Sequence, residues 1–473
     1  MKTQLFDDAL VLEPSNTLIV HLLFLFIIFV SLADIGQAQE VVNAGPPDAR
    51  ISTSLMQMSP ARMQATIERL VSFQTRSTLS AQDPAAVASG KGIGAAREWI
   101  KSEFERYSRE CGGCLEVKTD TFKEGPADRI PQQIEITNVY AVLKGTDPGN
   151  SRRVVLLTGH YDSRNSDTLD TTGAAPGAND DGSGTAVSLE CARVLSKLKF
   201  PATIIFLTVA GEEQGLNGSR HFAQMAKSAG WDIEAVLNND IVGGDRSAQQ
   251  DTSVVRIFSE GVPVAATDSD LRLIRNLGGE NDSTSRQLAR YIAQVGRTYD
   301  TTIKPVLVFR LDRYLRGGDH LSFNQQGYTA VRFTEFVEDY HHQHQNVRTE
   351  NGIEYGDLPK FVNFDYVANV ARLNAATLAS LASAPAPPDK VHLLTRQLEN
   401  NSTLTWEPSP GGLAAQYEVL WRATTSPEWE HVLPAGNVTR IVISKSKDNV
   451  IFAVRAADKE GHRSLPMVPL PER

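Results

Sequence analysis

Short apolar runs alternate with amphipathic stretches through the middle of the chain. Four apolar runs have the length of strands, namely ITNVYAVLKG (136–145), RRVVLLTGHYDS (152–163), ATIIFLTVAG (202–211) and EAVLNNDIVG (234–243). Between them, residues 184–198 and 219–230 carry apolar side chains at helical spacing. Such alternation is typical of an α/β fold, so we expect a mostly parallel central sheet with helices on both faces.

Helical patterns extend this unit in both directions. Residues 92–107 place Trp99, Ile100, Phe104 and Tyr107 on one helical face, and residues 364–382 have the pattern of a final helix. We therefore expect one α/β domain over residues 45–383.

The pattern changes to strands after a proline-rich linker, residues 384–388. The segments LTW, YEVLWR and VIFAVRA alternate apolar and polar side chains, and turn residues separate them. Residues 389–473 are thus expected to form a small all-β sandwich domain, and they resemble a fibronectin type III domain. The tether and the separate apolar faces predict a removable domain, which would bind a surface or polymer and carry no chemistry.

The N-terminus has the pattern of an export signal. Leu18–Leu32 is an apolar run of signal-peptide length, and small residues at Gly36 and Ala38 suit cleavage after residue 38. The alternative is an uncleaved membrane anchor. Under either interpretation the bulk of the chain is exported, as a secreted or periplasmic protein.

Composition and cysteine content narrow the class of protein. The chain has 473 residues and a formal net charge of −9, which argues against a nucleic-acid partner.

Export permits disulfides, and we expect Cys111 and Cys114 in ECGGC to form a local one. A redox dithiol or a metal knuckle are the alternatives, although a knuckle lacks a second cysteine pair. Cys191 lies in a helical pattern and is expected to be a buried free thiol.

Carboxylates follow the predicted strands at the points where those strands end. They occur in GHYDS, GANDDGSG, AGEEQG and LNNDIVG, and the first of these runs also holds a histidine. The candidate site residues are His160, Asp162, Asp180, Asp181, Glu212, Glu213 and Asp240. Ligands of open α/β sheets bind at the carboxyl ends of the strands. Taken singly, each residue is better explained as a helix cap, a turn residue or solvated surface. Together they would repel one another unless a multivalent cation balanced them, and one histidine with several carboxylates suits zinc.

These runs, with GGDHLSF and EDYHHQHQN, resemble exported zinc aminopeptidases that have a two-metal site. The wider superfamily includes glutamate carboxypeptidase and glutaminyl cyclase, and the resemblance covers about Met58 to Ala384. It implies two zinc ions and five metal ligands: His160, Asp180, Glu213, Asp240 and His342. His160 and Asp240 would bind the first metal, Glu213 the second, and Asp180 would bridge the two.

The resemblance leaves the fifth ligand open among three histidines. The family places this ligand after an aromatic residue and four positions before an acidic one. His342 has that offset, but Asn346 stands at the acidic position. His341 directly follows Tyr340, and His344 is the third choice.

The resemblance also implies roles for other residues. Glu212 would be the general base, and Asp162 a carboxylate that supports the active site. Asp319 and His320 fit a supporting role better than a ligand role. The peptide bond between Asp180 and Asp181 is expected to be cis.

The implied activity is hydrolysis of the N-terminal peptide bond of peptides or proteins, with a metal-activated water as nucleophile and Glu212 as proton carrier. A carboxypeptidase or a mono-zinc cyclase of the same fold are alternatives. A further alternative, from a different class, is an inactive binding protein that keeps the fold.

Overall fold

The computed structural model describes residues 42–246 and 249–472. The predicted signal peptide, residues 1–38, lies outside the described residues. Within the described ranges, none of the helices is both long and apolar enough to cross a membrane.

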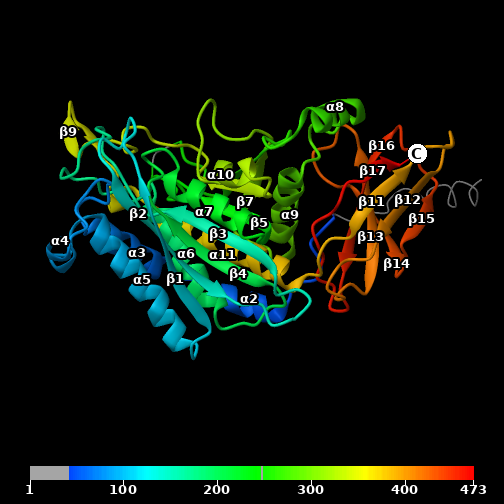
Figure 1. Cartoon of the computed structure of the whole chain (residues 1–473), viewed down its shortest axis with the longest axis horizontal. Coiled ribbons are helices and arrows are strands. Elements are labelled where there is room, and N and C mark those ends of the chain that lie inside the picture. The colour runs from blue at the N-terminus through cyan, green and yellow to red at the C-terminus, as the bar shows by residue number, and fades with distance from the viewer. Residues whose placement is uncertain (1–41, 247–248, 473) are drawn as a thin grey trace, which may run out of the picture. The chain divides into compact units, whose positions relative to one another are not determined.

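An eight-stranded sheet forms the centre of the larger part of the chain (Figure 1). Its order is β1 (Leu115–Glu124), β2 (Ile134–Leu143), β4 (Thr203–Val209), β3 (Arg153–His160), β5 (Asp232–Asn239), β8 (Ala330–Thr334), β6 (Val254–Ser259) and β7 (Lys304–Val308). Strands β4, β3, β5 and β8 are parallel to one another, and β6 is parallel to β7. The remaining pairs, β1–β2, β2–β4 and β6–β8, are antiparallel. The predicted mostly parallel sheet is confirmed.

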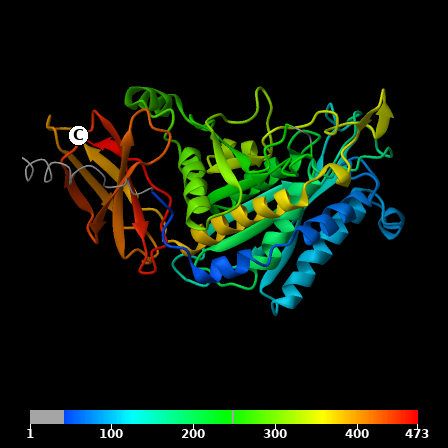
Figure 2. The same ribbon diagram turned by 180° about the vertical axis from the view of Figure 1, so that it is seen from behind.

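Helices cover both faces of this sheet, as predicted. The helices are α2 (Ala49–Leu55), α3 (Pro60–Val71), α4 (Pro84–Ala88), α5 (Gly92–Glu110), α6 (Gly182–Leu195), α7 (Asn217–Ser228), α8 (Asp268–Leu277), α9 (Thr284–Thr298), α10 (His320–Gln325), the 3-10 turn η1 (Pro359–Phe361) and α11 (Phe364–Ser383). Figure 2 shows α3, α5 and α11 in front of the sheet. Helix α6 contacts β3, β4, α3 and α11, whereas α7 and α10 contact each other and the sheet from the other face.

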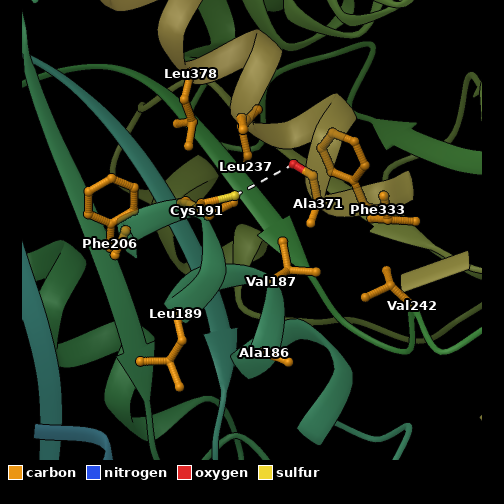
Figure 3. Packing of buried hydrophobic residues seen from close by; sticks show 14 of the residues in the cluster. Ala186, Val187, Leu189, Cys191, Phe206, Leu237, Val242, Phe333, Ala371 and Leu378 are labelled. Atoms are coloured by element: carbon orange, nitrogen blue, oxygen red, sulfur yellow. Dashed lines mark hydrogen bonds between the residues drawn. The ribbon is translucent and has the colours of Figure 1, made fainter. Parts of the chain in front are cut away.

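Alternation along β3 divides the core between the two faces. Val155 and Leu157 belong to the large cluster under α6 and α11, while Leu156 packs with Phe222 of α7 on the opposite face. Figure 3 shows the large cluster around Cys191 of α6, whose Sγ lies 3.6 Å from the carbonyl oxygen of Ala371. A strand buried on both faces explains why β3 reads as one continuous apolar run.

The cysteines occur in the states expected from the sequence. Cys111 and Cys114 form a disulfide directly after α5, and Cys191 is a buried free thiol. The bend between the paired cysteines uses Gly112 and Gly113, both at positive φ.

The C-terminal part is built of two small sheets. One has the order β15 (Arg440–Ile443), β12 (Ser402–Glu407), β11 (Asp389–Leu394) and β17 (Leu470–Glu472). The other has the order β14 (His431–Gly436), β13 (Gln416–Ala423) and β16 (Val450–Ala457). Apolar side chains from both sheets form one cluster, which includes Leu404, Trp406, Tyr417 and Val454. The likeness to fibronectin type III stays a prediction.

The segment between α11 and β11 is not a free tether. Ala384 and Ala386 are buried, and the guanidinium of Arg153 donates a 2.9 Å hydrogen bond to the carbonyl oxygen of Ala384. Polar contacts also join helix α9 and the residues just before it to the β-rich part. They are Trp429 Nε1 to Gln287 Oε1 (3.1 Å), Arg422 to Asp282 (2.6 Å), Arg455 to Gln294 (3.1 Å) and Tyr291 Oη to the Arg463 carbonyl (3.0 Å).

These contacts argue against the expectation of a freely removable domain. Arg422, Trp429 and Arg455 are all buried. Removing the β-rich part would break these buried hydrogen bonds and expose the face of α9 that it covers. We therefore expect the two parts to unfold together.

Trp429 offers a test of this coupling. Trp429→Ala should lower the free energy of unfolding by about 3–5 kcal/mol, because a large buried ring is lost together with its hydrogen bond to Gln287. Urea unfolding followed by circular dichroism and by fluorescence should show one shared transition in the parent chain. Trp421→Ala, at a half-buried position stacked on His431, is the control and should cost less. Two separated transitions in the parent chain would contradict the coupling.

Candidate metal centre

The candidate residues lie at the carboxyl edge of the parallel strands. His160 is the last residue of β3, Asp240 follows β5, and Glu212 and Glu213 follow β4. Asp180 lies in the loop that enters α6. Because β4, β3 and β5 are neighbours and parallel, their ends bring these side chains to one place. A cavity of about 620 Å³ is lined by Asp180, Glu212, Glu213 and Asp240.

His160, Glu212 and Asp240 form a first group of three. Each offers a ligand atom, and the three atoms lie within 4.8 Å of one another. His160 Nε2 lies 3.8 Å from Asp240 Oδ1 and 3.1 Å from Asp180 Oδ1.

Asp180, Glu213 and His344 form a second group with the same spacing limit. His344 Nε2 lies 2.8 Å from Asp180 Oδ2 and 3.1 Å from Glu213 Oε1. Asp180 thus presents one carboxylate oxygen to His160 and the other to His344, so its carboxylate lies between the two groups.

The structure does not place His342 in either of these groups. Its Nδ1 lies 2.6 Å from Asp245 Oδ2, and its ring stacks on Phe361 with centroids 3.6 Å apart. His341 is exposed and pairs with Asp339. His344, the third histidine of the segment, occupies the position expected for His342.

A local backbone conformation explains why the offset counted from the sequence points to His342 whereas the geometry points to His344. His344 has φ +55°, in the left-handed region, which turns the chain between it and His342. Asn346, which stands where an acidic residue was expected, instead accepts hydrogen bonds from the amide and hydroxyl of Ser166.

Asp162 lies beneath the adjacent glutamates. Its carboxylate accepts hydrogen bonds from the amides of Glu212 (3.3 Å) and Glu213 (3.2 Å) and from the hydroxyl of Thr78 (2.9 Å). A buried carboxylate that holds two successive amides fixes the direction of both side chains. This geometry is compatible with the predicted supporting role.

Asp319 and His320 are buried outside both groups of three. His320 Nε2 lies 2.9 Å from the carbonyl oxygen of Leu311. Burial raises the pKa of Asp319 to about 7. Neither residue is a member of either group of three, and their supporting role stays a prediction.

Glycines and caps shape the loops that carry the carboxylates. Gly211 has φ +76° and turns the chain from β4 into Glu212. A Cβ on Gly184 would lie 2.2 Å from the Asn239 carbonyl oxygen, so only glycine fits that close approach of α6 to β5. Asp181 caps α6 by accepting from the Gly184 amide, and the Asp180–Asp181 peptide bond is cis, as expected.

Burial and charged neighbours set the pKa values of the cluster. Although burial opposes it, the imidazoles of His344 and His160 hold the pKa of Asp180 well below its usual range. Glu213 and Asp180 in turn raise the pKa of His344 to about 10, against the effect of burial. Burial, with the nearby carboxylates of Asp240 and Glu213, raises the pKa of Glu212 well above its usual value.

Two buried atoms fit the demands of a metal ion. His160 Nε2 and Glu213 Oε1 lie near charged neighbours, yet neither makes a hydrogen bond of acceptable geometry to any described residue. Unsatisfied buried polar atoms of this kind are costly, and coordination of a divalent cation satisfies them. The donor set, two imidazoles with several carboxylates, suits zinc.

Three buried residues that sequence reasoning did not single out hold the site in place. Arg76 donates to the carbonyl oxygens of Tyr161, Pro176 and Gly177, which fixes the loop before Asp180. Asp357 accepts from the amides of Asn179 and Asp180. Arg332 lies 3.0 Å from Asp240 Oδ1. None of the three lies in a pattern that marks chemistry, because each acts through contacts far apart in the sequence.

Sequence comparison decides the family. The sequence profile of peptidase family M28 matches residues 138–357, which span β2 to the segment before η1. A protein of Pyrenophora tritici-repentis, described as a probable zinc metalloprotease, is 46% identical over 431 residues, which cover 90% of this chain and 88% of that protein. This chain belongs to peptidase family M28.

Other comparisons agree with this M28 assignment. A Pyricularia oryzae protein with the same description is 46% identical over 442 residues, covering 91% of this chain and 86% of the relative. The crystal structure of the Legionella pneumophila LapA aminopeptidase superposes with a TM-score of 0.50 at 22% identity. It covers 73% of this chain and 78% of LapA, and at that identity the likeness shows the fold alone.

The M28 site gives a direct test of which histidine binds metal. His344→Ala should lower the bound zinc by about one equivalent per chain, because the second group of three then keeps only two carboxylates. His342→Ala is the matched control and should leave the zinc of these two groups in place, since its imidazole pairs with Asp245 and stacks on Phe361 outside both groups. The measurement is zinc content by mass spectrometry after extensive dialysis. Loss of zinc from the His342 variant alone would reverse the assignment.

Proposed function

We propose that this protein is an exported zinc aminopeptidase that holds two zinc ions and removes N-terminal residues from peptides or proteins. The observation that carries the proposal is the position of Asp180 between His160 and His344, 3.1 Å and 2.8 Å away. One carboxylate between two separate groups of ligands is the arrangement that a two-metal site requires.

The residues divide between the two proposed ions as follows. His160, Asp180 and Asp240 would hold the first ion, and Asp180, Glu213 and His344 would hold the second. Zinc ions bound there would lower the pKa of a water molecule and polarise the carbonyl of the scissile peptide bond. The relatives' description as probable zinc metalloproteases supports the choice of metal.

Glu212 is the proposed general base. Both glutamates line the cavity, but Glu212 is half-buried and outside the second group, whereas Glu213 is buried 3.1 Å from His344, so the two adjacent carboxylates can take different roles. A carboxylate at this position would accept a proton from the attacking water and then donate it to the leaving amine. Asp162 keeps Glu212 aimed into the cavity through the backbone amide.

Two further points support the proposal. The fold neighbour LapA is described as an aminopeptidase. Export is supported by the predicted signal sequence and by the disulfide between Cys111 and Cys114, which is typical of proteins in oxidising compartments.

Hydrolysis of a panel of amino-acid p-nitroanilides tests the activity directly. We expect release of p-nitroaniline by the zinc-loaded protein, loss of activity with a chelator, and recovery on adding zinc. N-acetylated versions of the same substrates should be resistant, because an aminopeptidase needs a free amine. Cleavage of the acetylated substrates at equal rates would refute exopeptidase specificity.

The two glutamates should respond differently to the same substitution. Glu212→Gln should lower kcat by about 10²–10⁴ with both zinc ions retained, because the amide is nearly isosteric but accepts no proton. Glu213→Gln should lower zinc occupancy, because it removes a charged ligand. Zinc content and turnover are measured together for both variants. If Glu212→Gln loses zinc while Glu213→Gln keeps it and stays active, the two roles are reversed.

A further inference from the structure

The wall of the candidate active-site cavity carries four arginines in addition to the carboxylates. They are Arg129, Arg164, Arg313 and Arg316, and Leu216 and Ile241 are the aliphatic residues among the lining. The site as described uses none of these guanidinium groups as ligands or as proton carriers. Arginines that are not engaged by protein groups would be free to bind a ligand in this cavity.

Two of these arginines are already fully engaged by protein groups. Arg164 lies 2.9 Å from Glu213 and 2.6 Å from His344 Nδ1. Arg313 pairs with Asp312 (3.0 Å) and Glu338 (2.9 Å) and donates to the Gly317 carbonyl. These two hold the cavity wall and leave little capacity for a ligand.

Arg316 is only partly neutralised. Its NH1 lies 3.1 Å from Glu338, but the same carboxylate also pairs with Arg256 and Arg313. Three guanidinium groups therefore share the Glu338 carboxylate, and of these Arg313 also pairs with Asp312. The side chain of Arg316 is 34% exposed, so its remaining N–H groups can reach a molecule in the cavity.

Arg129 is the second available cation. It is exposed, and its one hydrogen bond within residues 42–246 and 249–472 goes from NH1 to the carbonyl oxygen of Glu213, 3.0 Å away. It makes no ion pair with a carboxylate of these described residues. Because it contacts Glu213, Arg129 lies at the second group of three. Arg313 and Arg316 lie on the other side, where Arg332 links Asp312 to Asp240.

Once metal is bound, these arginines would set the net charge of the cavity. This step rests on the proposed function. Two zinc ions would carry as much positive charge as Asp180, Glu212, Glu213 and Asp240 carry negative charge. The cavity would then be left with the excess of guanidinium groups, and an anionic group would be attracted to it.

We propose that this cavity selects substrates that carry a carboxylate close to the scissile bond. Arg316, on the Asp240 side, would bind this carboxylate, and Arg129, on the Glu213 side, would add positive charge to the cavity wall. Guanidinium groups with free N–H donors suit a carboxylate, because two parallel hydrogen bonds can form. The carboxylate has two sources, an acidic side chain at the N-terminal residue or the C-terminal carboxylate of a dipeptide. Both place one negative charge within reach of the cavity wall.

Isosteric substrate pairs separate charge from shape. In the first arm, L-glutamic acid p-nitroanilide is compared with L-glutamine p-nitroanilide; in the second, Leu-Gly is compared with Leu-glycinamide. We expect the charged member of at least one pair to have a kcat/KM about ten- to a hundredfold higher, which is the effect of one charge-assisted hydrogen-bond pair. The arm that shows the preference identifies the source of the carboxylate. Equal kcat/KM values in both arms would overturn the inference and leave the proposed aminopeptidase activity intact.

Arginine variants then locate the preference. Arg316→Gln and Arg129→Gln should each lower kcat/KM for the charged member more than for the neutral member, and Arg316→Lys should restore part of the preference. Arg256→Gln is the matched control, because Arg256 shares Glu338 but does not line this cavity. If the Arg256 variant loses the preference as fully as the Arg316 variant, then Arg316 does not bind the substrate. Thermal melting of every variant checks that it is folded.

A binding measurement keeps this test independent of turnover. L-glutamate and L-glutamine are titrated into the zinc-loaded protein by calorimetry. If glutamate binds more tightly than glutamine and Arg316→Gln removes the difference, the carboxylate site is supported, whether or not any substrate is hydrolysed. Absence of hydrolysis would refute only the proposed function. If glutamate binds no more tightly than glutamine and neither substrate arm shows a preference, the carboxylate site is refuted.

Discussion

The mutual repulsion of buried carboxylates is the constraint on which the site depends. Asp162, Asp180, Asp181, Glu213 and Asp240 are all buried within one region, and Glu212 borders it. Buried charges are tolerated only where they are paired or hydrogen-bonded. The carboxylates of the site are stabilised in two different ways. One set, which is structural, accepts hydrogen bonds from backbone amides, and the other set faces the cavity.

The structural carboxylates are satisfied by backbone amides. Asp162 holds the amides of Glu212 and Glu213, Asp181 holds those of His160 and Gly184, and Asp357 holds those of Asn179 and Asp180. Each of them therefore fixes the loop that presents another residue. Asp180 and Glu213, by contrast, face imidazoles, and Asp240 faces both His160 and Arg332. A divalent cation is the natural partner for this second set, because it can satisfy several oxygens at once.

Much of this arrangement could be predicted from the sequence, because strand ends are visible in it. The continuous apolar run of β3 ends at His160, and the parallel sheet forces the ends of β4, β3 and β5 together. For the last histidine, the sequence offset points to His342 and the geometry to His344, because His344 itself has a left-handed backbone in an irregular segment, where counting positions does not show which side chain faces the carboxylates. The removable C-terminal domain stays a prediction. The proline-rich segment suggested a tether, but the buried contacts of Arg422 and Trp429 with the region of α9 depend on tertiary packing that no local pattern reveals.

The arginines around the cavity also pair with buried carboxylates. Asp240 pairs with Arg332, which shares Asp312 with Arg313, which in turn shares Glu338 with Arg316 and Arg256. This chain of alternating charges begins at the carboxylates of the site and ends at the cavity rim with a guanidinium in excess. Without metal, that excess offsets the acidic interior. With the interior neutralised by zinc, the same arginines would become the dominant charges that an approaching peptide meets. The residues that make a carboxylate cluster tolerable in the folded chain would thereby also set which peptides the site accepts.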